Sequence, residues 1–234
     1  MSDNGSVVVI GGTSEIGMGI AKHYADEGRE VWVSSRDTER ASNAAKQIGG
    51  NSTGFVLDLN DAAEIEAPLS HIGPVQRLVL VAIERDANTL AEFNPESAAK
   101  LFTLKLVGYT QVIHVLASRL TDDASMVLFG GLAKEKPYPG GTTVATVNGG
   151  IATLVHTLTL ELAPKRVNAI HPAIVGDSWF WADKPTEVIE GFRSRTPTGT
   201  LVTVADVTDA TVFLLENPGM NGSNLNLDAG WLRT

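Results

Sequence analysis

The sequence has no cysteine among its 234 residues, which excludes disulfide bonds, thiolate nucleophiles and thiolate metal sites. Basic residues are also scarce: 18 Lys and Arg stand against 27 Asp and Glu, and the formal net charge is −9. Because nucleic-acid interfaces depend on clustered cations, this balance argues against a nucleic-acid partner. A chain without cysteine suits a reducing compartment, so we expect it to be cytoplasmic.

Targeting signals and long apolar runs are absent as well. The first five residues, Met-Ser-Asp-Asn-Gly, lack the basic region and apolar stretch of a signal peptide. We expect no run to reach the length of a membrane span, and hence no membrane association. The five histidines lack metal-ligand spacing and no Gly-x-Ser-x-Gly elbow occurs, so the sequence favours neither a metal site nor a serine hydrolase.

Apolar residues, 43% of the chain, are sufficient for one core, and we expect a single domain over residues 1–234. Short β-rich apolar runs predict strands over residues 6–10, 30–34, 53–57, 77–82, 125–129, 166–170 and 224–228. Apolar residues at helical spacing predict helices over residues 15–27, 38–48, 61–70, 96–120, 143–163 and 205–216. Alternating strands and helices predict an α/β class: a doubly wound parallel sheet of about seven strands, the three-layer Rossmann fold.

The first predicted strand leads into a glycine-rich turn, Gly-Gly-Thr-Ser-Glu-Ile-Gly at residues 11–17, and then into a helix. Gly11 and Gly12 permit a sharp turn after the strand. The helix that follows points unpaired N–H groups and the positive end of its dipole toward an anion. A turn of this kind between a strand and a helix predicts a dinucleotide-binding site.

The ends of the second and third strands bear on which dinucleotide binds. Ser35 stands where an acid would bind a ribose 2′-hydroxyl, and Arg36 follows it, so the pair favours a 2′-phosphate and hence NADP(H). Alternatively, Arg36 is a solvated residue at a helix start, beside Asp37. After the third strand, Asp58 and Leu59 could meet the adenine edge, or Asp58 could cap the next helix.

Together with two later stretches, this turn resembles the short-chain dehydrogenase/reductase family. The two stretches are Arg-Val-Asn-Ala-Ile-His-Pro at residues 166–172 and Asn-Gly-Ser-Asn-Leu-Asn-Leu-Asp-Ala-Gly-Trp at residues 221–231. The resemblance implies a homotetramer or dimer built on the helices at 96–120 and 143–163. It places in the cofactor site Gly11, Thr13, Ser14 and Ile16 at the pyrophosphate, Ala82 and Ile83 after the fourth strand, and Pro172 and Val175 against the nicotinamide.

Two parts of this site depart from the family's pattern. Glu15 stands where a second glycine is usual and adds a negative charge near the phosphates. The fourth strand ends in Leu80-Val81-Ala82-Ile83, where the family has Asn-Asn-Ala-Gly. The loss of the two asparagines removes hydrogen bonds that brace the sheet, and the apolar side chains can brace it by packing instead.

The resemblance also locates the four residues with which the family reduces carbonyls, and all four positions differ. Lys105 replaces the Asn, Gly131 the Ser, Val144 the Tyr and Asn148 the Lys. A positioned acid or base contributes about 10²- to 10⁴-fold, so we expect plain ketone reduction to be crippled. The catalytic residues are therefore unknown, and the substitutes that could supply a proton, or could equally be packing residues, are Lys105, Tyr109, Tyr138, Thr143 and Thr146.

A long segment leaves the sixth strand at the edge of the sheet where ligands bind in such folds. It is expected to be irregular over roughly residues 171–185 and to act as a lid over about 171–195. Trp179, Phe180 and Trp181 favour an apolar or aromatic substrate under this lid, or else a subunit contact. With Gly131 and Val144, these aromatic residues form the expected substrate site.

Two functions remain open at this stage. Because hydride chemistry belongs to the cofactor, NADP(H) could reduce a small apolar or aromatic molecule that needs no protein acid, such as an iminium. The alternative is a catalytically inactive subunit that supports an active relative in a mixed oligomer. Arg36 and the intact glycine turn favour the enzyme, whereas Gly131 and Val144 favour the inactive subunit. His171 either contacts the substrate or is a structural histidine.

Overall fold

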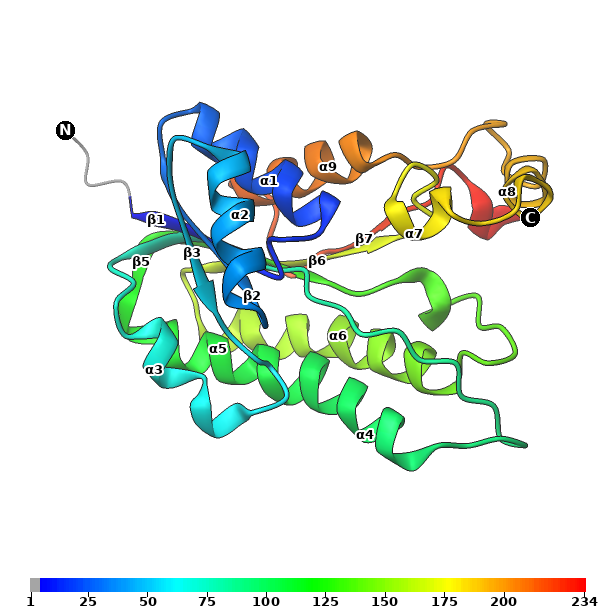
Figure 1. The fold of residues 1–234 in the computed structure, drawn as a ribbon, viewed down its shortest axis with the longest axis horizontal. Helices are drawn as coiled ribbons and strands as arrows, with labels where there is room; N and C mark the ends of the chain where they lie inside the picture. Colours follow the sequence, from blue (N-terminus) through cyan, green and yellow to red (C-terminus); the bar gives the residue numbers. More distant parts are fainter. Residues whose placement is uncertain (1–4) are drawn as a thin grey trace.

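A computed structural model describes residues 5–234, and its seven strands form one sheet in the order β3-β2-β1-β4-β5-β6-β7 (Figure 1). The strands are β1 (Ser6–Ile10), β2 (Glu30–Ser35), β3 (Asn51–Val56), β4 (Val75–Leu80), β5 (Leu120–Phe129), β6 (Arg166–Pro172) and β7 (Asn224–Leu227). Every neighbouring pair is parallel. The order reverses between β1 and β4, the position at which open parallel sheets of this kind bind ligands beyond the carboxyl edge. The predicted fold class is confirmed.

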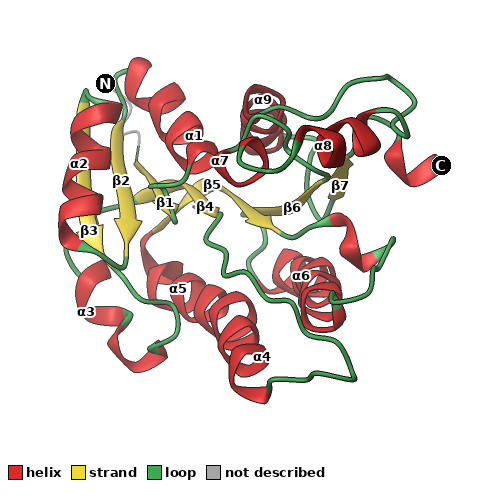
Figure 2. Ribbon diagram, turned by 45° about the vertical axis from the view of Figure 1, so that its right-hand side comes forward, coloured by secondary structure: helices red, strands yellow, loops and turns green. Residues whose placement is uncertain are grey.

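Helices cover both faces of the sheet, so three layers result (Figure 2). One face carries α1 (Glu15–Asp26), α2 (Thr38–Ile48) and α9 (Val204–Glu216). The other carries α3 (Glu66–Leu69), α4 (Pro95–Phe102), α5 (Tyr109–Leu116) and α6 (Thr142–Glu161). Successive residues of β1 point alternately to these layers: Val7 and Val9 pack on the α1 side, and Val8 and Ile10 on the α5 side. This burial on both faces explains why β1 is almost continuously apolar.

Two predicted helices are wrong in detail. The helix expected over residues 96–120 is divided into α4, a π-helical segment η2 (Thr103–Gly108), α5 and a short 3₁₀ turn, and β5 already begins at Leu120. The helix expected over residues 61–70 is reduced to a 3₁₀ turn, η1 (Ala62–Glu64), and the single turn α3, which contains Pro68. Proline lacks the N–H that a longer helix would need at that position.

The expectation about long apolar segments also needs correction. The segment Pro95–Arg119 is long and apolar enough, by length and composition, to cross a membrane. However, Val112 and Leu116 of α5 are fully buried in the core beneath the sheet. Part of its apolar surface is therefore buried in the core of this fold.

The lid segment is more regular than expected. Within it lie two short helices, α7 (Trp179–Ala182) and α8 (Thr186–Arg193). Both lie at the end of the molecule where β6 and β7 terminate, beyond the carboxyl edge of the sheet (Figure 1). The predicted irregular stretch at 171–185 therefore includes the end of β6 and all of α7.

Candidate functional site

The turn between β1 and α1 has room only for glycine at its critical positions. Gly11 has φ +86°, and a Cβ there would lie 2.6 Å from the Cα of Ala82. A Cβ on Gly17 would lie 2.6 Å from the carbonyl oxygen of Gly11. Ser14 caps the N-terminus of α1, and its hydroxyl accepts a hydrogen bond from the N–H of Gly17 at 3.2 Å. The N–H groups of the first turn before Gly17 have no partner within the helix, so they can bind an anion.

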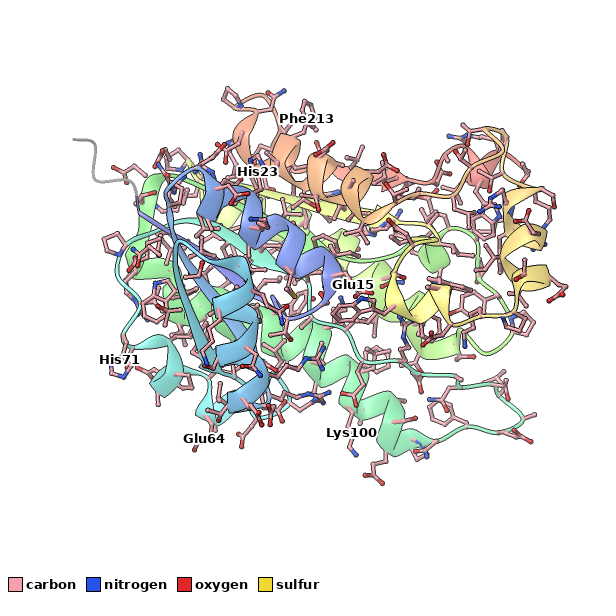
Figure 3. All side chains as sticks on the ribbon, turned by 45° about the horizontal axis from the view of Figure 1, so that its top comes forward. Glu15, His23, Glu64, His71, Lys100 and Phe213 are labelled. Carbon is pink, nitrogen blue, oxygen red and sulfur yellow. The ribbon has the colours of Figure 1, made fainter. Side chains whose placement is uncertain are left out.

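Glu15 connects this turn to the lid. Its carboxylate accepts a hydrogen bond from the backbone N–H of Trp179, the first residue of α7. Figure 3 shows Glu15 at the start of α1, on the side where the lid lies. The carboxylate of Glu15, which we expect near the phosphates of a bound dinucleotide, therefore also joins the glycine turn to the lid segment.

Arg36 extends from the end of β2 and forms an ion pair with Glu84, which follows β4, at 3.4 Å. Its side chain is 59% exposed. Glu84 also accepts a hydrogen bond from the side chain of Asn60 at 3.4 Å. Asp58 is exposed and accepts a hydrogen bond from the N–H of Asn60 at 2.9 Å, so it stabilises the turn before η1. Polar side chains that follow β2, β3 and β4 therefore contact one another at the carboxyl edge of the sheet.

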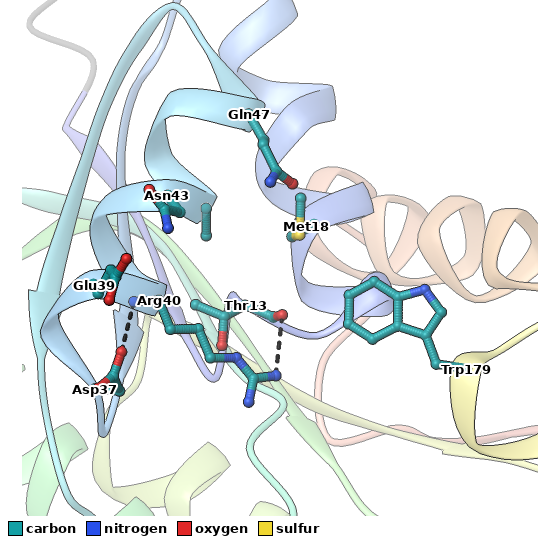
Figure 4. Close-up of a pocket in the computed structure, with 9 residues that line it drawn as sticks. Thr13, Met18, Asp37, Glu39, Arg40, Asn43, Gln47 and Trp179 are labelled. Atoms are coloured by element: carbon teal, nitrogen blue, oxygen red, sulfur yellow. Dashed lines mark hydrogen bonds between the residues drawn. The ribbon is translucent and has the colours of Figure 1, made fainter.

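A second arginine, which the sequence analysis did not single out, lies beside the glycine turn. The guanidinium of Arg40, in the first turn of α2, donates to the carbonyl oxygen of Thr13 at 3.4 Å. In the sequence, only its position four residues after Arg36 could have indicated that Arg40 lies near the glycine turn. A pocket of about 390 Å³ opens here between α1, α2 and the lid (Figure 4). Its walls include Thr13 and Trp179 but none of the other predicted site residues.

The remaining predicted cofactor residues differ in their exposure. Ile83 is 56% exposed, whereas Leu59 and Val175 are buried in the two cores. Ile16 packs partly against the core on the α1 side. The hydroxyl of Ser35 accepts a hydrogen bond from the N–H of Asp37 at 3.3 Å. The other two, Ala82 and Pro172, are half-buried.

Gly131 and Asn148, which the resemblance assigns to the positions of the family's serine and lysine, are adjacent in the structure. An ideal Cβ on Gly131 would lie 2.7 Å from the side-chain nitrogen of Asn148. A Cβ on the preceding Gly130 would lie 2.3 Å from Nδ1 of His171. Side chains at these two glycines would therefore require Asn148 and His171 to move.

His171 holds this strand end in place. Its Nδ1 accepts a hydrogen bond from the N–H of Gly131 at 3.1 Å, and its Nε2 is 2.9 Å from Oδ1 of Asn224. The imidazole is fully buried, and burial lowers the pKa of His171 to about 4. These contacts are those of a structural, neutral histidine.

Lys105 and Tyr109 form a buried pair on the π-helical segment and α5. The ammonium of Lys105 donates to the carbonyl oxygen of Phe129 at 2.8 Å and to the hydroxyl of Tyr109 at 3.0 Å. The hydroxyl of Tyr109 donates to the carbonyl oxygen of Ala82 at 2.6 Å. Burial lowers the pKa of Lys105 to about 7 and raises that of Tyr109. The pair therefore ties the residues that follow β4 to the end of β5.

The other three residues that could supply a proton are Tyr138, Thr143 and Thr146, and none of them contacts Lys105 or Tyr109 through a hydrogen bond. Thr143 is buried and accepts a hydrogen bond from the side chain of Asn88 at 3.3 Å. Thr146 is exposed and donates to the carbonyl of Thr142 in its own helix at 2.9 Å. Tyr138 is 54% exposed. Among residues 5–234, no group of three or more carboxylate or histidine side chains is arranged to hold a metal ion.

Aromatic rings of the lid form a continuous row. Phe180 meets Trp181 edge to face at 5.2 Å between centroids, and Trp181 meets Phe192 of α8 at 5.6 Å. Phe192 in turn lies 6.5 Å from Trp231 near the C-terminus. Trp179 stands outside this row and is 57% exposed. Such edge-to-face pairs stabilise the segment that carries them.

Three comparisons place this geometry among known proteins. A family model described as enoyl-(acyl carrier protein) reductase matches residues 11–232. A 3-oxoacyl-[acyl-carrier-protein] reductase from Mus musculus is 28% identical over 229 residues, 95% of each chain. The MalC reductase/Diels-Alderase of Malbranchea aurantiaca has a TM-score of 0.89 at 21% identity, covering 99% of this chain and 97% of its own. An actinorhodin polyketide ketoreductase variant with NADPH has a TM-score of 0.88 at 23% identity, covering 100% and 99%.

Proposed function

Because the chain belongs to the short-chain dehydrogenase/reductase family, whose relatives here are oxidoreductases, we propose that it is an NADP(H)-dependent oxidoreductase lacking the family's proton-transfer residues. The observation that carries this proposal is the glycine turn with two arginines beside it. Gly11 and Gly17 leave no room for a Cβ, and Arg36 and Arg40 flank the turn. A protein with no use for a nucleotide would not need this arrangement.

The residues present fit a dinucleotide phosphate. The first-turn N–H groups of α1, with Thr13 and Ser14, would hold the pyrophosphate, and Arg36 and Arg40 would hold a 2′-phosphate. The side-chain oxygen of Asn60 is buried and has no hydrogen-bond partner within residues 5–234, so it offers an acceptor for the amino group of adenine. The related ketoreductase solved with NADPH supports the choice of nucleotide. When bound, the cofactor supplies the hydride.

The proposed substrate is a small apolar or aromatic molecule that needs no proton from the protein. Val144 and Gly131 carry no ionisable group, and Lys105 and Tyr109 are buried and partnered with main-chain carbonyls. The row of lid aromatics supplies an apolar surface beside the same edge. An iminium, which becomes neutral on accepting hydride, meets both conditions.

Titration of the purified protein with NADPH and with NADH, followed by nicotinamide fluorescence, tests the cofactor proposal. We expect NADPH to bind at least roughly tenfold more tightly, because two arginines would contact the 2′-phosphate. Arg36→Ala and Arg40→Ala should each reduce this preference, whereas Lys22→Ala, on the exposed face of α1, should not. If neither nucleotide binds, the proposal is wrong.

The chemistry is tested by comparing a cyclic iminium with a ketone of matched size, following the consumption of NADPH. We expect the iminium to be reduced and the ketone to react at least 10²-fold more slowly, since no acid protonates its oxygen. Equal rates would show that an unrecognised group supplies the proton.

The contact between Glu15 and the lid favours a second candidate, an inactive subunit in a mixed oligomer. In that case the carboxylate of Glu15 would keep the lid against the turn and no nucleotide would enter. In either case we propose a dimer or homotetramer built on the helices that precede β5 and on α6, where Val107 and Leu160 are 51% and 81% exposed. The nucleotide titration separates the two candidates, and light scattering measures the assembly.

A further inference from the structure

A buried amine lies at the carboxyl edge of the sheet, where β4, β5 and β6 are neighbours. Lys105 is only 2% exposed, and its Nζ donates to the carbonyl oxygen of Phe129, the last residue of β5. It also donates to Tyr109, whose hydroxyl donates to the carbonyl oxygen of Ala82 after β4. Burial is the main cause of the lowered pKa of His171 on β6, and the charge of Lys105 adds to that shift. The amine therefore acts on the ends of all three strands.

The hydrogen bonds of Lys105 suit a neutral amine. A neutral amine has two N–H groups, and the bonds to Phe129 and Tyr109 use both. An ammonium has a third N–H, for which the described residues 5–234 provide no further hydrogen-bond acceptor. None of their carboxylates forms an ion pair with Lys105 either. Protonation would therefore leave a buried charge without a counter-ion, which is unfavourable.

The titratable groups on the surrounding elements do not compensate for this charge. Tyr109, on α5, is neutral because burial raises its pKa, and the pKa of His171, on β6, is lowered to about 4. On α4, Glu96 and Lys100 pair with each other at the exposed surface. The helix α6 carries no titratable side chain before His156. Burial lowers the pKa of the amine to about 7, with no nearby charge to oppose it.

A charge at this position bears on the redox state of the nucleotide. The nicotinamide ring is neutral in NADPH and positively charged in NADP⁺, whereas both forms carry the same phosphates. The residues that we expect against this ring are Pro172, which ends β6, and Val175, which follows it. Pro172 is adjacent to His171, where the charge of Lys105 already has an effect. Because the site is shielded from water, salt screens repulsion there only weakly.

We propose that Lys105 is a specificity-determining residue for the redox state of the nucleotide: its ammonium form repels the oxidised ring, whereas its neutral form admits both states. This inference rests on the proposed function and adds a direction to it. When the amine is protonated, the protein retains NADPH in preference to NADP⁺, which favours reduction of the substrate and release of the oxidised nucleotide. When the amine is neutral, this preference is lost.

A competition titration tests the inference on the purified protein. NADP⁺ displaces NADPH, and nicotinamide fluorescence gives the ratio of the two dissociation constants at pH 6 and at pH 9. We expect the preference for NADPH to be at least about fivefold greater at pH 6, because Lys105 is then charged. The 2′-phosphate also titrates near pH 6, but it is common to both nucleotides and cancels in the ratio.

Lys105→Met removes the titrating group and should give the same ratio at both pH values. Lys46→Met, on the exposed face of α2, should retain the pH dependence of the unmodified protein. A second measurement needs no variant: calorimetry at pH 7 in two buffers of different ionisation enthalpy counts the protons released on binding. We expect NADP⁺ to release more protons than NADPH, because the oxidised ring displaces the proton of Lys105.

Three results would overturn the inference. The first is a ratio that is the same at pH 6 and pH 9, and the second is equal proton release by the two nucleotides. The third is a pH dependence that persists in Lys105→Met, because another group would then be responsible. Binding of both nucleotides at a constant ratio refutes this inference and leaves the proposed function intact, whereas binding of neither refutes both.

Discussion

At the amino-terminal edge of the sheet, Arg77 donates to both carboxylate oxygens of Glu216, each at 2.7 Å. At the carboxyl edge, Arg85 lies over the ring of Phe180 and has no ion pair with any of residues 5–234. Tyr24 donates to the same carboxylate at 2.6 Å, so the first group is complete within the protein. Charges that satisfy one another stabilise the fold, and charges left without a counter-ion at a crevice are available to a ligand.

The amino-terminal edge also fixes the end of α9. Arg166, on β6, donates to the carbonyl oxygens of Leu214 at 3.0 Å and of Asn217 and Met220 at 2.9 Å each. A cation at the C-terminus of a helix satisfies carbonyls that have no partner within the helix. The carboxyl edge uses its arginines differently, since Arg36 makes a single contact with Glu84 and Arg40 a single contact with Thr13 of the glycine turn, each at 3.4 Å.

The largest expected effect on stability comes from removing the ion pair between Arg77 and Glu216 at the amino-terminal edge. Arg77→Met should reduce the free energy of unfolding by about 3 kcal/mol, because it leaves the carboxylate of Glu216 without its cation. Urea unfolding followed by circular dichroism measures this loss. Lys22→Met, which removes an exposed pair with Asp26, should change it by less than about 0.5 kcal/mol. Similar losses in the two variants would contradict the difference between the edges.

An intermediate effect is expected from Lys105, a buried charge at the carboxyl edge. Burial lowers the pKa of Lys105 from 10.5 to about 7 in the folded protein. Between pH 7 and pH 10.5, Lys105 is therefore protonated in the unfolded chain and largely neutral in the folded protein. Stability is therefore complete above the unfolded value and is lost as the pH falls toward 7, by about 1 kcal/mol per pH unit. Unfolding at pH 9 and pH 7 should thus differ by about 2 kcal/mol.

Lys105→Met removes this titration, and the variant should show little change in stability between pH 9 and pH 7. Lys46→Met, on the exposed end of α2, is the matched control and should behave as the unmodified protein does. If Lys105→Met retains the full pH dependence, another group is responsible and the ammonium is not buried in solution as it is here.

The smallest effect concerns Glu15. Glu15→Gln retains an acceptor for the N–H of Trp179 and removes the negative charge beside the proposed pyrophosphate site. We expect NADPH to bind about fivefold more tightly, equivalent to about 1 kcal/mol, and the gain to shrink at high salt. Nicotinamide fluorescence at two salt concentrations measures it. Unchanged affinity at low salt would place the carboxylate away from the phosphates.

Most of the architecture could be predicted from the sequence. The seven strands lie where alternating apolar runs placed them, and the glycine turn follows β1 as expected. The boundaries that failed depend on distant contacts: β5 begins at Leu120 because Leu120 pairs with Val75, and α3 is shortened around Pro68. The division of the helix at Thr103–Gly108 has no signal in the apolar spacing.

The site was less predictable than the fold. The sequence identified Arg36 but not Arg40, since one contact decides that Arg40 reaches Thr13. It offered Lys105 and Tyr109 as proton donors, and the structure partners both with main-chain carbonyls. The glutamate in the phosphate turn was visible in the sequence, whereas its hydrogen bond to the lid was not.

The sequence by itself determined the order of strands and helices and the glycine turn, because each depends on local spacing or residue type. Only the tertiary structure decided which charges are satisfied. It paired Arg77 with Glu216, buried Lys105 beneath the sheet edge and brought Arg85 and Lys184 to one ring. Electrostatic interactions depend on distance and burial, and residues far apart along the chain acquire both only when it folds.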